Sequence, residues 1–122
     1  MKKHQDDFQA IIATIQLYFN STYEGDASQL KQAFHPDARI NGSIHGNQFD
    51  WPLDDFMQRV CSKPTAKDKQ EAFDKEIIAI DKTHDIAIVK TKVVAADIIF
   101  TDYITLLKIE GAWIIRHKSF SG

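Results

Sequence analysis

The spacing of apolar residues in the first half of the chain predicts three helices. Over residues 4–23 they return every three or four positions, as on one face of an amphipathic helix, and Gly25 suits its C-terminal cap. Residues 27–34 and 52–61 are predicted as two shorter helices, and Pro52 suits the first position of the second. These helices precede most of the expected β structure.

β-Branched and aromatic runs predict strands in the middle of the chain and throughout its second half. The turn signal Gly46-Asn47 separates two short strands, and long strands follow. The expected strand ranges are 38–44, 48–51, 72–81, 86–96 and the hairpin 98–120. Helices followed by long antiparallel strands indicate an α+β fold, in which the helices cover one face of a strongly curved antiparallel sheet.

The hairpin of residues 98–120 is expected to place two polar side chains on an apolar face. A two-residue turn at Glu110-Gly111 would make Ile104 face His117. Because side chains alternate across a strand, Asp102 and His117 then become diagonal neighbours at one end of this face. The opposite face mixes apolar and polar residues: Thr101, Tyr103, Thr105, Leu107, Ile114, Arg116, Lys118 and Phe120.

Composition narrows the class of protein. The chain has 122 residues, a formal net charge of −2 and 43% hydrophobic residues, so we expect one globular domain spanning residues 1–122. It shows no basic stripe for nucleic acid, no apolar run long enough to span a membrane and no signal peptide. The single cysteine, Cys61, fits a reducing compartment, and the expected location is cytoplasmic.

Several motifs together resemble those of a known family. In chain order they are Tyr18, Gly25-Asp26, Leu30, Phe34-His35-Pro36-Asp37-Ala38, Gly42, then F-x-D-Y-I-x-L-L-K from Phe100 and G-x-W-x-I-x-x-K-x-F from Gly111. This order resembles the putative lumazine-binding proteins. They belong to the nuclear-transport-factor-2-like (NTF2-like) superfamily of cystatin-like folds, with the SnoaL-like cyclases and ketosteroid isomerases. The resemblance covers residues 8–120 and implies a cone-shaped α+β barrel that dimerises through the outer sheet face.

One departure from the superfamily bears on the expected chemistry. Ketosteroid isomerases have an aspartate general base about four residues after the first-strand alanine. Counted from Ala38, that position is Gly42, and Asn41 precedes it. Neither residue is a base, so the isomerase reaction is not predicted. The mixed outer face of the hairpin suits a subunit interface, and a symmetric homodimer is expected.

Five residues are predicted to contact a ligand in a cavity between the first helix and the sheet. Tyr18 could donate a hydrogen bond to a ligand carbonyl, although it could equally be a helix-to-sheet packing residue. Trp51 and Phe56 could cover the cavity, and Phe56 also fits a core role. Asp102 and His117 are the candidate catalytic pair, because a carboxylate bound to imidazole raises its basicity; a purely structural polar pair is the alternative.

Three functions remain open from the sequence. The leading one is binding of a small, partly apolar organic molecule without a cofactor. The second is an enzyme of the cyclase, isomerase or dehydratase kind, in which His117 or Asp102 moves a proton. The third is a dimeric interaction module whose cavity is filled by its own side chains. No histidine or cysteine spacing typical of a metal site occurs, so no metal is expected.

Overall fold

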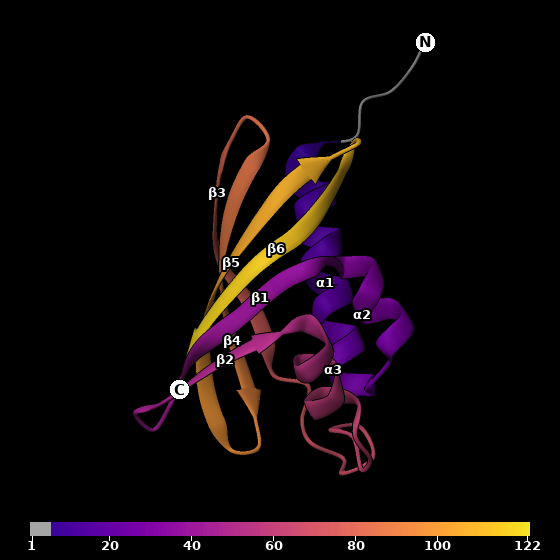
Figure 1. Cartoon of the computed structure of the whole chain (residues 1–122), viewed down its shortest axis with the longest axis vertical. Coiled ribbons are helices and arrows are strands. Elements are labelled where there is room, and N and C mark those ends of the chain that lie inside the picture. Colours follow the sequence, from indigo (N-terminus) through magenta and orange to yellow (C-terminus); the bar gives the residue numbers. More distant parts are fainter. Residues whose placement is uncertain (1–5) are drawn as a thin grey trace.

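The computed structural model of the chain describes residues 6–122, and Figure 1 labels the elements of this part. In chain order these are α1 Asp7–Glu24, α2 Ala27–Ala33, β1 Phe34–Ile44, β2 Asn47–Pro52, α3 Leu53–Cys61, β3 Lys75–Thr83, β4 Ile86–Ala95, β5 Ile98–Ile109 and β6 Ala112–Ser121. The three predicted helices are present. The predicted start of the first one, at His4, lies outside the described residues.

The strands form one curved sheet in the order β2-β1-β6-β5-β4-β3. Neighbouring strands in the sheet pair antiparallel, except that β1 and β6 run parallel. The α+β class is therefore confirmed, and the sheet is mixed. The first and last strands can pair in parallel because no tight hairpin joins them and most of the chain lies between them.

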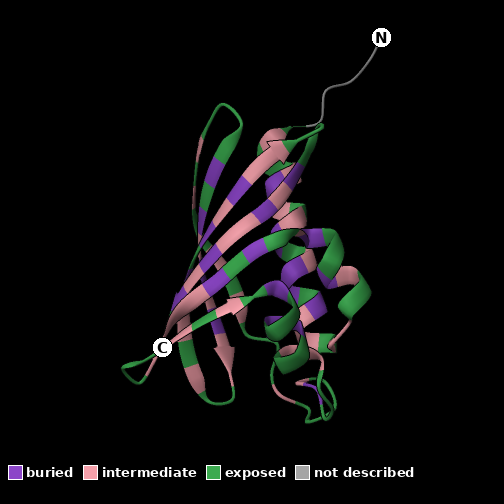
Figure 2. Ribbon diagram, viewed as in Figure 1, coloured by how far each residue is buried: buried purple, intermediate pink, exposed green. Residues whose placement is uncertain are grey.

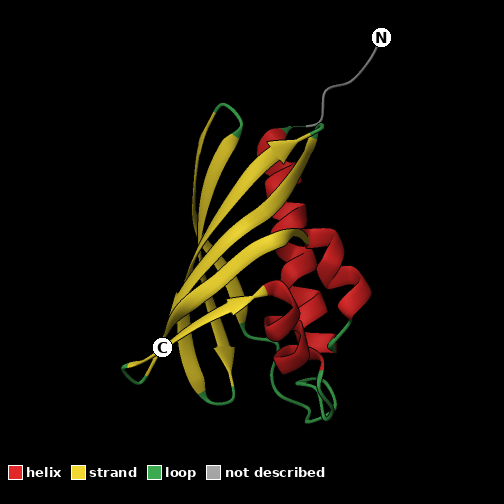
Figure 3. Ribbon diagram, in the orientation of Figure 1, coloured by secondary structure: helices red, strands yellow, loops and turns green. Residues whose placement is uncertain are grey.

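The three helices lie together on one face of the sheet (Figure 3). Asp6 caps the start of α1 by accepting a hydrogen bond from the Phe8 amide, and Gly25 ends the helix with a φ of 68°. Buried positions recur along the strands and on the sides of the helices that face them (Figure 2). The fully buried apolar residues that join the two layers include Ile11, Ile15, Leu30, Ile40, Ile104, Leu106 and Ile115.

Strand β1 begins earlier than the sequence suggested. Phe34 was expected to end the second helix, but its backbone is extended, with φ −108° and ψ 140°, and it opens β1. His35 precedes Pro36, and a residue before proline avoids the helical region. The chain therefore leaves the helix one residue before the proline-restricted position, and the Phe34 side chain enters the core at 2% exposure.

The register of the β5–β6 hairpin follows the prediction only near the turn. Ile109 pairs with Ala112 and Leu106 with Ile115, as expected. The register then shifts between Thr105 and Leu106, so that Thr105, and not Ile104, faces His117. A bulge adds one residue to β6 and changes which side chains point inward beyond it. The expected pairing beyond Leu106 is wrong for this reason.

Gly42 allows β1 and β6 to approach closely. It pairs with Phe120 in the parallel register, and a Cβ at this position would lie 1.9 Å from the Phe120 carbonyl oxygen. No side chain fits there without separating the two strands. The position at which ketosteroid isomerases would have their base is therefore closed to any side chain in this chain.

Candidate functional site

A cavity of about 270 Å³ lies between the helices and the inner face of the sheet. Its floor is formed by side chains of β4, β5 and β6, and α1, α3 and the segment before β3 surround it. Most of the lining is apolar or aromatic, and the residues that contribute to it include Trp51, Phe56, Val93, Ala95, Phe100 and Phe120. A pocket of this volume and character accommodates a small organic molecule.

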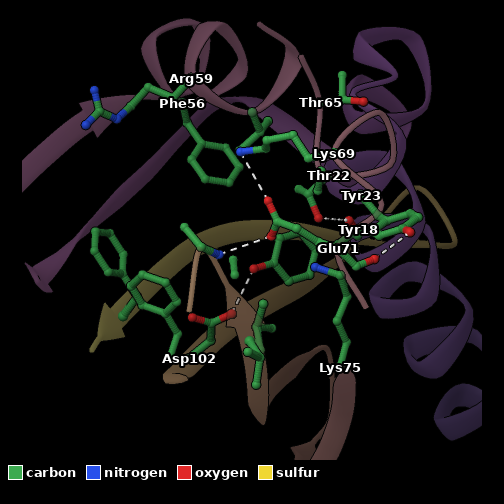
Figure 4. A pocket seen from close by; sticks show the side chains of 18 of the residues that line it. Tyr18, Thr22, Tyr23, Phe56, Arg59, Thr65, Lys69, Glu71, Lys75 and Asp102 are labelled. Carbon is green, nitrogen blue, oxygen red and sulfur yellow. Dashed lines mark hydrogen bonds and ion pairs between the residues drawn. The ribbon is translucent and has the colours of Figure 1, made fainter. Parts of the chain in front are cut away.

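Tyr18, Asp102 and Lys118 form a buried polar cluster at the cavity wall. The Tyr18 hydroxyl donates a hydrogen bond of 2.8 Å to Asp102 Oδ2 and accepts one of 2.7 Å from Lys118 Nζ. Lys118 Nζ lies 3.9 Å from the same carboxylate oxygen. Figure 4 shows Tyr18 and Asp102 pointing toward one another across the cavity wall. The cluster joins α1, β5 and β6.

Burial is the main cause of the pKa shifts of Tyr18 and Lys118 in this cluster. Asp102 is 1% exposed, and the Thr91 hydroxyl donates a second hydrogen bond of 3.2 Å to its Oδ2. Burial, followed by the Asp102 charge, raises the pKa of Tyr18 well above its ordinary value, so the phenol keeps its proton. Burial lowers the pKa of the Lys118 ammonium, and the Asp102 carboxylate opposes this change.

Aromatic rings also lie close to the Lys118 ammonium. Its Nζ lies 4.5 Å from the centre of the Phe56 ring and 5.6 Å from that of Phe120. Ring faces attract a cation, and this attraction is larger where water is excluded. The ammonium is thus held between a carboxylate, a phenol and two aromatic rings, and it retains N–H groups that do not bond Tyr18.

Trp51 forms another wall of the cavity together with the end of β6. Its ring stacks on Phe120 with centroids 5.6 Å apart and planes inclined by 15°. The guanidinium of Arg59, on α3, lies 4.5 Å from the centre of the Trp51 ring. These contacts hold the indole in one orientation, so this wall is shaped before any ligand enters.

A second lysine faces the cavity from the first position of β3. Lys75 pairs with Val93, whose side chain also lines the cavity, and it is half-buried. Burial, with a smaller contribution from the charge of Lys118, lowers the pKa of the Lys75 ammonium to about 8; Asp102 and Glu71 oppose this shift. Glu71 itself is engaged, because its carboxylate bonds Lys69 and the Ala96 amide.

The structure brings together four of the five predicted site residues. Tyr18, Trp51, Phe56 and Asp102 line the cavity. His117 does not: it pairs with Thr105 on the far side of the β6 bulge, so its side chain projects away from the face that carries Asp102. The expected Asp102–His117 pair is therefore wrong. The bulge instead turns Lys118 and Phe120 inward, although both were expected on the outer face.

Sequence reasoning missed Lys118, Lys75 and Thr91. If the apolar Phe120 is taken to face inward, alternation places Lys118 on the inner face as well. The prediction instead counted positions from the turn at Glu110-Gly111 and therefore crossed the bulge. Lys75 precedes the inward-facing Ile77 by two positions, which is a signal for the same face. Thr91 gave no signal beyond its alternation with Val89 and Val93, since threonine is common in strands of any burial.

Two further findings concern the described part of the chain. Residues 6–122 contain no group of three or more histidine, cysteine, aspartate or glutamate side chains placed to hold a metal ion. Of the helices in the same range, none has the length and apolar character needed to cross a bilayer.

The fold and cavity define a protein of the NTF2-like class, an α+β cone with helices against a curved sheet. The family model described as putative lumazine-binding matches residues 6–121, and the chain belongs to this family. The resemblance seen in the sequence is thereby confirmed.

Known proteins of similar sequence and structure agree with this assignment. An NTF2-like protein of unknown function from Methylobacillus flagellatus KT has a TM-score of 0.84, with 28% identity and 98% and 94% of the two chains covered. Another from Silicibacter pomeroyi DSS-3 has a TM-score of 0.80, 24% identity and 93% of each chain covered. Among curated proteins, aldolase FrzH of a Cladobotryum species is 30% identical, with 98% of this chain and 96% of that protein covered.

Proposed function

We propose that this protein binds a small, partly apolar organic molecule that carries a carbonyl or similar oxygen acceptor. The observation that carries the proposal is the placement of the Tyr18–Asp102–Lys118 cluster at the wall of an otherwise apolar cavity of about 270 Å³. Apolar lining with a few converging polar groups is the usual composition of a ligand pocket. The family description supports the same class of function.

The polar cluster favours an acceptor oxygen as the ligand's polar group. Lys118 donates one hydrogen bond to Tyr18, and an ammonium has three N–H groups. An oxygen atom from a ligand could therefore bond Lys118 without displacing a protein contact. The two aromatic walls, Trp51 with Phe120 and Phe56, would cover the apolar body of such a molecule.

Filling the cavity tests this proposal. Ala95 is half-buried on β4 and lines the cavity, so Ala95→Phe is expected to occupy ligand space. Ala112 is exposed at the start of β6, and Ala112→Phe is the matched control. A panel of small aryl and alkyl ketones, aldehydes and alcohols would be screened by ligand-observed NMR. Binding to the wild type and to Ala112→Phe, with loss in Ala95→Phe, is expected; binding that survives Ala95→Phe would place the ligand elsewhere.

A second candidate function is catalysis of proton transfer next to a carbonyl group. The 30% identity to a protein named an aldolase favours it. An aldol reaction removes a proton from the carbon beside a carbonyl and stabilises negative charge on the oxygen. Asp102 would serve as the base, and the Lys118 ammonium would stabilise the charge. His117, the other candidate from the sequence, does not face this cavity.

Hydrogen exchange in D₂O tests the catalytic candidate without knowledge of the natural substrate. Ketones that bind in the NMR screen would be incubated with the protein, and deuterium incorporation beside the carbonyl would be followed. We expect accelerated exchange that Asp102→Asn abolishes. Exchange at the uncatalysed rate in the wild type, for every ketone that binds, would remove this reaction and leave the binding function.

We also propose that the protein is a homodimer that associates through the outer face of the sheet. Exposed apolar residues gather on that face, among them Ile86, Ile88, Ile99 and Tyr103. An apolar surface of this kind is typical of an interaction site.

The interaction module considered from the sequence differs in requiring no ligand, and the cavity disfavours it. The cytoplasmic location stays a prediction from the sequence.

A further inference from the structure

We propose that Lys75 forms a reversible imine with an aldehyde or ketone that enters the cavity. This inference rests on the proposed binding function and adds a covalent step to it. It makes Lys75 the residue that bonds the ligand covalently, beside the Tyr18–Asp102–Lys118 cluster. Aldehydes and ketones, and not carboxylic acids or alcohols, would be the ligands that the protein retains longest.

The position of Lys75 supports this role. It is the first residue of β3, and its cross-strand partner Val93 lines the cavity beside it. The Lys75 side chain extends from the strand into the cavity (Figure 4). Within residues 6–122 no carboxylate lies within ion-pairing distance of its ammonium, and its aromatic contact is Phe73, 5.8 Å away. The nitrogen is therefore free to react.

The surroundings of Lys75 favour the neutral amine, which is the nucleophilic form. Burial and the nearby Lys118 charge bring the pKa of its ammonium to about 8. Desolvation and a second cation are the two effects known to activate a nucleophilic lysine. The acidic groups that face it, Asp102 and Glu71, act in the opposite direction but are engaged with Lys118 and Lys69.

The other lysines at the cavity are less suited to this reaction. Lys118 donates to Tyr18 and lies 3.9 Å from the Asp102 carboxylate, whose charge favours the protonated, non-nucleophilic form of its nitrogen. Lys69 pairs with Glu71 at 3.1 Å, and its side chain is 50% exposed. Its amine is therefore held by a carboxylate and surrounded by water. Lys75 alone among the three combines cavity access with the absence of an ion pair among the described residues.

The chemical step balances without a co-reactant. The lone pair of the neutral Lys75 amine attacks the carbonyl carbon, a C–N bond forms, and the carbonyl π electrons move to oxygen, which takes up a proton. The carbinolamine then loses this oxygen as water, and a protonated C=N bond remains. Overall, the ammonium and the carbonyl compound give the iminium and one water molecule. Lys118, which faces the same cavity, can supply the proton to the departing oxygen.

Reductive trapping with benzaldehyde tests the proposal. The protein would be incubated at pH 7.5 with dilute benzaldehyde and sodium cyanoborohydride, which delivers hydride to the iminium carbon and leaves a benzyl group on nitrogen. Peptide mass spectrometry would follow each lysine over time. The internal control is Lys31, which is exposed on α2, away from the cavity and from the proposed dimer face. We expect benzylation of Lys75 to be at least about tenfold faster than that of Lys31, because the lowered pKa of Lys75 raises the neutral fraction of its amine.

Three variants and one unreactive analogue separate the outcomes. Lys75→Arg keeps the charge and should abolish the fast phase, Ala95→Phe should suppress it by blocking entry, and Lys31→Arg should leave it intact. Benzyl alcohol binding, measured by NMR, reports the cavity without an imine. If benzyl alcohol binds but Lys75 reacts no faster than Lys31, the imine is refuted and the binding function stands. A fast phase on Lys118 would also refute the assignment to Lys75. If benzyl alcohol does not bind and no lysine reacts quickly, both the imine and the binding of this ligand class are contradicted.

Discussion

The Tyr18 hydroxyl and the Asp102 carboxylate, 84 positions apart in the sequence, meet at 2.8 Å in the interior of the protein. Tyr18 lies on α1 and Asp102 on β5, so this hydrogen bond connects the helical layer to the sheet at the cavity wall. The same hydroxyl accepts a hydrogen bond from Lys118. The polar groups that we assign to ligand binding are therefore also part of what holds the two layers together.

Replacing Tyr18 should show this dual role. Tyr18→Phe removes the donor to Asp102 and the acceptor of Lys118, and both charged groups are buried. We expect the free energy of unfolding to fall by about 1–3 kcal/mol, the cost of leaving buried partners without a hydrogen bond. Urea unfolding measures it. Tyr103→Phe is the control, because that side chain is 48% exposed and loss of its hydroxyl should change the free energy of unfolding only slightly. Equal effects of the two substitutions would contradict the structural role of Tyr18.

Asp102 and Lys118 should behave as a coupled pair. Asp102→Asn leaves a buried ammonium without a countercharge, and Lys118→Met leaves a buried carboxylate. We expect each to lower the free energy of unfolding by about 3–5 kcal/mol. The double variant should lose less free energy of unfolding than the two single variants lose together, by about 1 kcal/mol or more. The second substitution removes the charge that the first one left unpaired. Strict additivity in a double-mutant cycle would mean that the two side chains, 3.9 Å apart, do not interact in solution.

Lys75 should make the free energy of unfolding depend on pH in the alkaline range. Its folded pKa is about 8 and its ordinary value is 10.5, so between these values the unfolded chain binds more protons than the folded one. The free energy of unfolding therefore rises with pH in this window, by at most about 1.4 kcal/mol per pH unit from this group. The difference between the wild type and Lys75→Met, followed by urea unfolding from pH 7.5 to 9.5, should show the rise. A flat difference would argue against a depressed pKa at Lys75.

Gly42 should tolerate no side chain. Gly42→Ala places a Cβ within 1.9 Å of the Phe120 carbonyl oxygen, so we expect a loss of about 3 kcal/mol or more in the free energy of unfolding, or failure to fold. Gly46→Ala is the comparison: its φ is +83°, but no atom lies within 4 Å of the added Cβ, and a cost of about 1–2 kcal/mol is expected. Similar thermal stability of the two variants would show that β1 and β6 can separate easily at this point.

The outer face of the sheet should control the subunit count. Ile88 is 43% exposed there, near the exposed Ile86 and Tyr103. Sedimentation velocity of Ile88→Lys is expected to show a monomer where the wild type is a dimer. Gln32→Lys is the control: it introduces the same lysine on the exposed side of α2, away from the sheet, and this variant should remain dimeric. A dimer that persists in Ile88→Lys would place the interface on another surface.

The sequence predicts the elements of this fold well, because helix and strand spacings are local properties. Glycine and proline at Gly25 and Pro52 also mark boundaries by their own backbone preferences. The site depends on which face each strand turns inward, and a bulge changes that by one residue. The prediction of Asp102 as an inward residue survived because β5 alternates regularly between Asp102 and Leu106. The prediction of His117 failed because the extra residue lies in β6, between Ile115 and His117.

The bulge in β6 also has a consequence for comparing members of the family. If Arg116 were deleted, His117 would follow Ile115 directly, and simple alternation would still turn Lys118 inward. A relative one residue shorter here would thus keep the same inner surface, whereas one of equal length with a straight strand would present its histidine to the cavity. Proteins with the same residues in the same alignment columns can therefore have different chemistry inside, and inner-face residues are best compared by their hydrogen-bonded partners on β5.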